Sequence, residues 1–444
     1  MRTLRLTAVI LAVVVLLPLP AQAGRPLAAV ETFDYSQNLH PLGFSERAFD
    51  NSSGLTGWNS DLAFWGSTVI QGAIDGFRII NASAPANPTV ITDYRDCPGD
   101  QGDVIVWENI VVRSWNSPAP AGASCGGVPV AAGTEGVHVF DISNPTSPQM
   151  VKYVPIACGS HTATGVPDAA NNRLLVYNSA SNNNCPWIDI VEVPLDAPGD
   201  AEIINRVDSM HTCHDIGVIL GDANRAACAG GSGARIFSLD PADGGSLDDP
   251  MLMTHFEIPG VTIGHSAAWT WDGEVLVFGH EPGGGVAPRC QESTADVDKT
   301  LFFYDHEGNQ LGTMLFPRPQ TAAENCTWHN YNIVPTDKRY VMVSGNYQAG
   351  ISVVDFTDPA NAREIAYADP APLPFTPASP FGLQLGGDWS SYWYNGVIYQ
   401  SDITRGLITW KLSDPAVAGA KKLSHMNPQT QEFSFPARPV PRGR

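Results

Sequence analysis

The sequence predicts an all-β protein, a seven-bladed β-propeller with four-stranded blades. A short strand followed by a turn, which contains Pro in most copies, recurs seven times between residues 58 and 415, with one apolar run before each copy and another after it. The 42 Gly and 36 Pro among 444 residues interrupt the chain too often for long helices. Units of four strands over roughly 40 to 65 residues are the sequence pattern of propeller blades.

The N-terminus predicts export. Two arginines precede an apolar run at residues 6–19, and small residues at 21–23 offer a cleavage site, so residues 1–23 read as a signal peptide and the mature chain begins at Gly24. No later apolar run approaches the roughly 20 residues that cross a bilayer. We therefore expect a secreted or cell-surface protein without membrane insertion.

The repeated turn is clearest in "GVHVFDISNPTSP" (136–148) and "GISVVDFTDP" (350–359). Apolar and β-branched residues form a strand, and Pro ends it because Pro lacks the amide hydrogen that a continuing ladder requires. Further copies lie at 76–88, 187–198, 234–241, 300–308 and 406–415. These copies resemble the LVIVD repeat of bacterial surface and secreted propeller proteins. The resemblance covers most of residues 58–415 and implies the propeller fold, but no single activity.

The propeller is expected at residues 58–415, with a segment on either side of it. Residues 24–57 form an N-terminal extension that could supply a strand to close the ring. Residues 416–444 are rich in Pro and Arg and are expected to trail in solvent.

The charge of the chain limits its partners. With 25 Lys and Arg against 45 Asp and Glu, the formal net charge is −20, so nucleic acid and anionic membrane surfaces are poor partners because both require a basic face, and we expect no nucleic-acid binding. Cations suit such a chain better, although a surplus of carboxylates also serves solubility. We expect a monomer that binds a small molecule or an extracellular protein or polysaccharide.

The eight cysteines fall in close sequential couples. An even number in an exported chain predicts disulfides, although eight cysteines allow roughly 100 different pairings. We expect the sequential pairing, which joins Cys97 to Cys125, Cys158 to Cys185, Cys213 to Cys228 and Cys290 to Cys326.

One position recurs at the start of the innermost strands. His265 stands eight residues before Gly273, and Asp388 stands eight before Gly396, with aromatic residues at matching places after each. In blade order the position is occupied by Asp61, Asp103, His161, His214, His265, His329 and Asp388. Because the innermost strands of a propeller line its channel, these side chains should form a ring at one mouth.

Four imidazoles in that ring predict a metal site. Imidazole suits copper, iron and zinc, whereas calcium prefers an all-oxygen shell, so we expect a divalent transition metal ion. The predicted ligands are His161, His214, His265 and His329, and Asp61, Asp103, Asp388 and His211 are expected to complete the ring or to support the ligands. The alternative is that these groups only satisfy backbone groups between blades. His280 and Glu281, at the end of the hairpin that His265 begins, are expected to form a solvated pair.

Two functions are compatible with this sequence, and it identifies no catalytic residue. The first is an exported metal-dependent enzyme with oxidoreductase or hydrolytic chemistry, similar in architecture to the copper-dependent selenium-binding and methanethiol oxidase propellers. The second is a non-catalytic extracellular binding or adhesion scaffold whose channel is polar for structural reasons alone.

Overall fold

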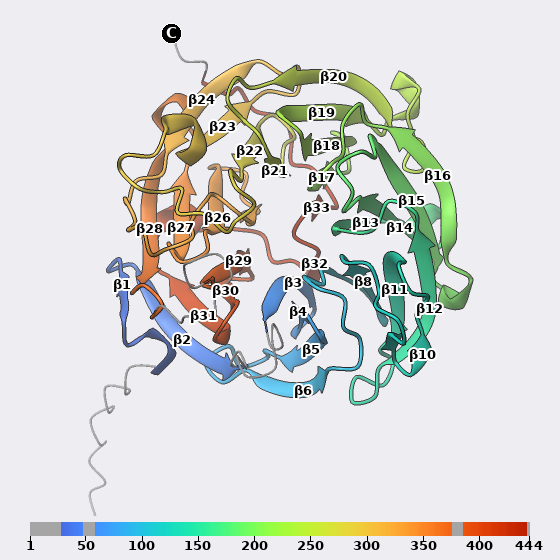
Figure 1. The fold of residues 1–444 in the computed structure, drawn as a ribbon. Helices are drawn as coiled ribbons and strands as arrows, with labels where there is room; N and C mark the ends of the chain where they lie inside the picture. Colours follow the sequence, from blue (N-terminus) through green and yellow to red (C-terminus); the bar gives the residue numbers. More distant parts are fainter. Residues whose placement is uncertain (1–27, 48–57, 375–384, 442–444) are drawn as a thin grey trace, which may run out of the picture.

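A computed structural model describes residues 28–47, 58–374 and 385–441 of the chain. Seven four-stranded antiparallel sheets stand in a ring around a central channel, which confirms the predicted seven-bladed β-propeller (Figure 1). The predicted signal peptide lies outside the described residues.

The strands of each blade succeed one another from the channel outward. The innermost strands are β3 (Asn59–Trp65), β7 (Val104–Trp107), β13 (Thr162–Asp168), β17 (Ile216–Ile219), β21 (Gly264–Trp269), β25 (Tyr331–Ile333) and β29 (Asp388–Tyr394). The second strands are β4 (Thr68–Ala73), β8 (Ile110–Trp115), β14 (Arg173–Ser179), β18 (Arg225–Gly230), β22 (Leu276–His280), β26 (Val341–Gly345) and β30 (Val397–Asp402).

The outer half of each blade contains the repeated turn. The third strands are β5 (Gly76–Asn81), β11 (Glu135–Asp141), β15 (Trp187–Pro194), β19 (Gly233–Ser238), β23 (Thr300–Tyr304), β27 (Ile351–Asp355) and β31 (Gly406–Leu412). The outermost strands of the first six blades are β6 (Thr89–Tyr94), β12 (Gln149–Ile156), β16 (Glu202–Asp208), β20 (Met251–Glu257), β24 (Gln310–Leu315) and β28 (Arg363–Pro370).

The chain closes the ring with a strand from its N-terminal extension. β2 (Leu39–Glu46) is the outermost strand of the seventh blade and pairs antiparallel with β31. β1 (Phe33–Tyr35) adds a fifth strand to the sixth blade beside β28. The first and last described parts of the chain are therefore hydrogen-bonded to each other in one sheet.

Short elements decorate the loops. β9 (Ser124–Cys125) and β10 (Val128–Pro129) form a small hairpin between β8 and β11. The 3₁₀ turns are η1 (Ala28–Val30), η2 (Ala169–Asn171), η3 (Pro198–Asp200), η4 (Pro241–Asp243), η5 (Asp296–Lys299), η6 (Pro359–Asn361) and η7 (Pro415–Val417).

The repeated turn has a local physical cause. The side-chain oxygen of Asp141 accepts a hydrogen bond of 2.8 Å from the amide of Ser143, and Asp355 accepts one of 3.1 Å from Thr357. Asn81 does the same for Ser83. Such a bond offers the backbone a partner other than the sheet ladder, so the strand ends where Asp or Asn stands in the repeat.

The hydrophobic core is divided among the blade boundaries. Each boundary buries its own apolar cluster, as between blades four and five, where Trp269 and Phe278 pack with Ile236. Equivalent clusters fill the other six boundaries. The blades are thus joined mainly by burial of apolar side chains, which contributes roughly 25 cal/mol for each Å² removed from water.

The four disulfides confirm the sequential pairing. They join Cys97 to Cys125, Cys158 to Cys185, Cys213 to Cys228 and Cys290 to Cys326. In each case the two cysteines lie in the same blade or in the adjoining loops, so the bonds fix local geometry and do not staple distant blades.

The C-terminal segment does not trail in solvent, so that expectation is wrong: residues 425–431 pair with innermost strands, and Phe433 and Phe435 pack against a core cluster. β32 (His425–Met426) pairs with β3, and β33 (Thr430–Gln431) pairs with β17 (Figure 1). The side-chain amide of Gln431 also donates to the carbonyl of Trp269 in the fifth blade. Because its partners lie near the far ends of the innermost strands, the segment crosses the end of the channel opposite to the predicted histidine mouth.

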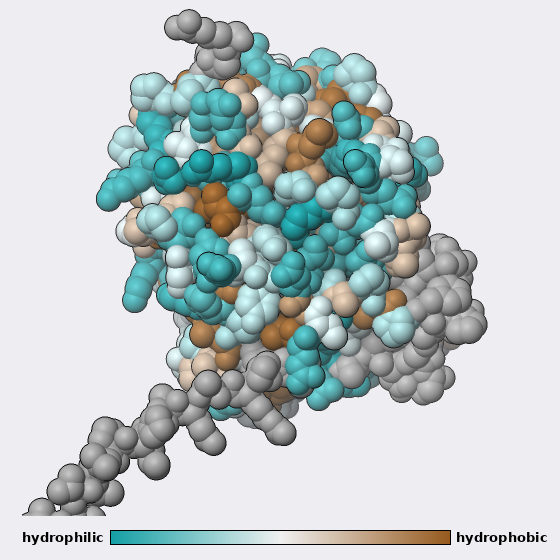
Figure 2. Space-filling view, turned by 90° about the vertical axis from the view of Figure 1, so that its left-hand side faces the viewer, coloured by the Kyte–Doolittle hydropathy of each residue, from teal (hydrophilic) through white to brown (hydrophobic). Residues whose placement is uncertain are grey.

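One side of the molecule has a mostly polar surface. On the side of the ring seen in Figure 2, hydrophilic residues predominate and hydrophobic residues form small separate groups. Within the described parts of the chain, no helix is long and apolar enough to cross a membrane.

Asn427 offers a test of the contribution of the C-terminal segment to stability. Its buried side chain bonds both the amide and the carbonyl of Val106, at 2.9 and 3.0 Å. Asn427→Ala should lower the free energy of unfolding by about 3 kcal/mol, because two buried backbone groups lose their partners. Urea unfolding measures the change, and Asn144→Ala, at an exposed turn, is the control. Equal midpoints for both variants would contradict this role.

Candidate metal centre at one mouth of the channel

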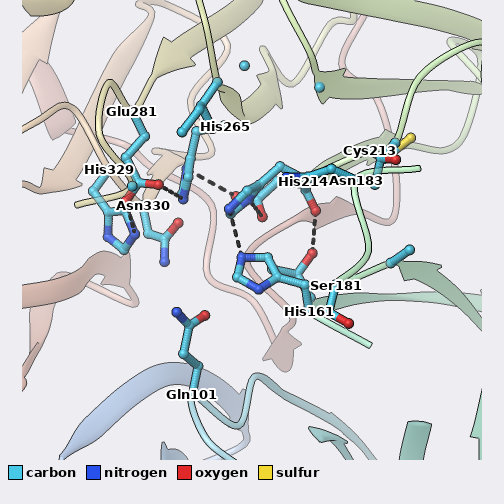
Figure 3. A pocket seen from close by; sticks show the side chains of 18 of the residues that line it. Gln101, His161, Ser181, Asn183, Cys213, His214, His265, Glu281, His329 and Asn330 are labelled. Atoms are coloured by element: carbon cyan, nitrogen blue, oxygen red, sulfur yellow. Dashed lines mark hydrogen bonds and ion pairs between the residues drawn. The ribbon is translucent and has the colours of Figure 1, made fainter. Parts of the chain in front are cut away.

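The four predicted histidines come together at the mouth where the innermost strands begin. They belong to four consecutive blades and form an arc in which neighbouring ring centroids lie 4.2, 3.8 and 4.6 Å apart, in the order His161, His214, His265 and His329 (Figure 3). The arc borders a pocket of about 410 Å³.

The Nδ1 atom of each imidazole lies within hydrogen-bonding distance of an oxygen atom outside the arc. Nδ1 of His161 lies 2.8 Å from Oδ1 of Asn116, and Nδ1 of His329 lies 2.6 Å from the carbonyl oxygen of Trp389. Both oxygens can only accept, so both Nδ1 atoms carry hydrogen.

The two central histidines are held in the same way. Nδ1 of His214 lies 3.2 Å from the carboxylate of Asp215. Nδ1 of His265 lies 2.5 Å from Oγ of Ser266, which itself donates to the carbonyl of His329 and is therefore free only to accept from the ring. With a hydrogen on every Nδ1, the lone pair of each neutral ring is on Nε2.

The Nε2 atoms face one another and an acidic side chain. Nε2 of His161 and Nε2 of His214 lie 2.7 Å apart, a contact between two lone pairs unless a proton or a cation lies there. Nε2 of His265 lies 3.6 Å from Oε2 of Glu281, and Nε2 of His329 lies 3.6 Å from Oε1 of the same carboxylate. Tyr347 donates to Glu281 at 2.6 Å.

Burial keeps most of these imidazoles neutral. It lowers the pKa of His161 and of His265 well below the ordinary value, and neighbouring imidazoles lower both further. It lowers the pKa of His329 to about 3. Burial opposes protonation of His214 too, but the hydrogen bond and charge of Asp215 raise the pKa of that ring above its ordinary value. Neutral imidazole is the form that ligates metal ions.

Two groups of ligand-type side chains overlap at His265. One contains His214 and Asp215, and the other contains Glu281 and His329; in each group one ligand atom per residue lies within 4.8 Å of the others. Nitrogens that share one ion at about 2.0–2.1 Å lie about 3 Å apart. The spacing within each of these two groups is therefore compatible with a shared ion, whereas His161 belongs to neither group.

The aspartates of the predicted ring lie in different surroundings. Asp61 and Asp103 are buried and share a side-chain hydrogen bond; burial raises the pKa of both, and the charge of Asp61 raises that of Asp103 further. Asp103 lines the pocket, and Asp61 accepts hydrogen bonds from Tyr392 and Gln429. This carboxyl pair lies beside the imidazole arc and is not interleaved with it.

Asp388 and His211 are peripheral to the arc. Asp388 is fully buried, accepts a hydrogen bond from Ser391, and pairs through its backbone with Tyr347. His211 borders the pocket but is half-exposed, with its Nε2 3.7 Å from Glu257.

The expected solvated pair of His280 and Glu281 is wrong. Glu281 is only 4% exposed and lies between His265 and His329, and His280 is fully buried against Thr262 and Val297. The hairpin register contained the signal, because His280 pairs with Gly264 and the amide of Glu281 donates to the carbonyl of Ile263. Residue 281 thus lies opposite residue 263, two positions before His265, and is a diagonal neighbour of that histidine. Asp215 and Tyr347 were also missed. Asp215 directly follows His214 in sequence, whereas no local pattern marks Tyr347.

Comparison with known proteins supports the repeat and the fold. Residues 129–155 match the LVIVD repeat family, over β11 and most of β12. No curated protein matches the chain.

Several solved structures are similar to this chain at low sequence identity. Raptor from Chaetomium thermophilum has a TM-score of 0.50 at 11% identity over 84% of this chain, which spans 29% of the Raptor chain. A putative 6-phosphogluconolactonase from Bacteroides fragilis has a TM-score of 0.47 at 11% identity, covering 83% of this chain and 98% of that one. The computationally designed Ika8 protein has 0.45 at 12%, covering 84% and 99%. The likeness to Raptor shows the fold alone.

The hydrogen bonds to Nδ1 predict a tautomer that can be observed. At neutral pH and without metal, His161, His265 and His329 should be neutral rings protonated at Nδ1, because their acceptors hold the hydrogen there and burial disfavours the cation. Long-range proton–nitrogen NMR correlations with labelled histidine identify the tautomer. Asn116→Leu should change the pattern of His161 and leave that of His329 unaltered; rings protonated at Nε2 would refute the assignment.

Proposed function

We propose that this LVIVD-repeat propeller is an exported metalloprotein that binds a divalent transition metal ion at the mouth of its channel and acts there on a small polar molecule. Nε2 of His161, His214, His265 and His329 would ligate the ion, with the Glu281 carboxylate beside them. The main support is that four converging imidazoles all have Nδ1 held by an acceptor, which leaves four Nε2 lone pairs toward one region.

That support is specific because buried histidines with only a structural role commonly use both nitrogens to satisfy neighbouring groups. Metal-ligating histidines instead donate one ring N–H to a carboxylate, carbonyl or similar acceptor, which orients the ring and makes the other nitrogen a better ligand. His280 illustrates the structural kind, since its two nitrogens contact Thr262 and Val297. In the arc, by contrast, Nε2 of His161 and Nε2 of His214 face each other, and it is His329 whose Nε2 has a hydroxyl neighbour, that of Tyr347 at 2.9 Å.

The donor set favours copper, iron or zinc. Imidazole is a ligand for all three, and the single carboxylate is too small a share of the donors for calcium. A bound ion of this kind would supply Lewis-acid or redox chemistry to a molecule in the pocket. The protein's own groups would orient that molecule, since Gln101, Asn183 and Asn330 line the same pocket.

Export belongs to the same proposal. The predicted signal peptide at 1–23 is its sequence basis, and four disulfides are typical of an oxidising compartment. Intact mass of the exported protein should correspond to a chain that begins at Gly24.

Metal content tests the proposed centre. Protein purified without a His tag and dialysed should retain about one ion per chain, and His265→Ala should lose most of it, because the central imidazole belongs to both ligand groups. His255→Ala is the matched control, since His255 is exposed on the outer strand β20. Elemental analysis gives the ratio.

The opposite outcome favours the scaffold. If wild type and both variants hold the same trace of metal, even after exposure to copper, iron and zinc salts, the arc is a set of structural hydrogen bonds. The protein would then be a non-catalytic extracellular binding module.

A further inference from the structure

We propose that Tyr347 is an additional ligand of the ion, bound through its phenolate oxygen, so that the centre in an oxidised state is a metal–phenolate complex. This inference rests on the proposed metal centre, and it adds an oxygen donor to the four predicted histidine ligands. It also narrows the chemistry, because a phenolate stabilises a higher oxidation state of a redox metal and so favours copper or iron over zinc.

The phenol oxygen occupies the ligand region of the site. Oη of Tyr347 lies 2.9 Å from Nε2 of His329 and 2.6 Å from Oε1 of Glu281. Its ring centroid is 4.2 Å from that of His329, and the residue is only 5% exposed. The oxygen is therefore directed at the two side chains that, with His265, form one of the potential ligand groups.

The backbone holds Tyr347 there at a conformational cost. Its φ of 54° lies in the left-handed region, which bulky residues rarely adopt. The Tyr347 amide donates to the Asp388 carbonyl at 2.8 Å, and the Asp388 amide donates back at 2.7 Å. Strain of this kind persists where the surroundings enforce it, and it concentrates at functional sites.

Glycine clears the space that the side chain needs. A Cβ atom at Gly285 would collide with Oη of Tyr347, and one at Gly387 would collide with the Tyr347 backbone. Both glycines are themselves in left-handed conformations. Gly285 thus leaves room for the phenol, and Gly387 leaves room for the backbone that carries it.

The hydroxyl also lies between two acceptors. It has one hydrogen, whereas both the Glu281 oxygen and Nε2 of His329 accept, because Nδ1 of His329 carries the ring hydrogen for Trp389. A cation among the three atoms would satisfy all of them. Coordination replaces the O–H bond by an oxygen–metal bond and releases one proton to solvent by way of Glu281, and no electron is transferred.

Copper(II) alone is the probe for this ligand. Added to dialysed protein, it should give wild type an intense visible phenolate-to-copper charge-transfer band, with phenolate ring modes enhanced in the resonance Raman spectrum. Tyr347→Phe keeps the ring that packs on His329, so it should still bind copper, with about 10- to 100-fold lower affinity and without the band. Tyr35→Phe, at a partly exposed position on β1, should behave as wild type.

The outcomes separate the two proposals. Copper bound by wild type without the band, or an unchanged band in Tyr347→Phe, overturns the phenolate ligand and leaves the histidine centre standing. Wild type that takes up no copper, as measured by elemental analysis of the same samples, overturns both.

Discussion

Closure of the ring is the constraint on which the site depends. The four imidazoles come from blades three to six, and each is positioned by a group from its neighbouring blade or its own strand. Ser266 donates to the carbonyl of His329 across one boundary, and His329 donates to the carbonyl of Trp389 across the next. These bonds form only if successive blades keep a fixed rotation about the axis. β2 maintains that rotation by completing the last blade with the start of the chain.

The seven equivalent positions around the channel axis fall into two chemically different groups. Blades three to six supply imidazoles, whereas blades one and two supply Asp61 and Asp103, which bond each other. The two groups differ in the side chains that contact them. Gln429, from the segment that crosses the far end of the channel, donates to Asp61 at 3.1 Å. The carboxyl pair is thereby occupied within the protein, while the Nε2 atoms of the arc are left facing the pocket.

The fold could be predicted because its determinants are local. Alternating apolar residues end at an Asp or Asn whose side chain caps the next amide, as at Asp141 and Asp355, and this signal repeats with every blade. The register of His265 could be predicted for the same reason, since a hairpin of fixed length separates it from Gly273.

The remaining features depend on contacts between distant residues. Glu281 enters the site through the pairing of Gly264 with His280, which a strand pattern does not specify to the residue. Tyr347 depends on a left-handed φ held by Asp388. The Pro- and Arg-rich composition near the C-terminus suggested a solvated tail, yet the amides of Asn427 and Gln431 find backbone partners in blades two and five.

The charge balance at the histidine mouth gives a reason for a cation there. The C-terminal segment crosses one end of the channel, so water and ions approach the arc chiefly from the pocket side, and electrostatic interactions inside are less screened than at the surface. Asp215 and Glu281 bring two buried carboxyl groups to the arc. Burial raises the pKa of Glu281 to about 7, although the charge of His214 and the hydrogen bond from Tyr347 lower it. Without a cation, this carboxyl group is therefore partly protonated near neutral pH. A divalent ion among the Nε2 atoms would balance the negative charge of both carboxylates. In a purely structural arc, bound protons alone would have to balance that charge.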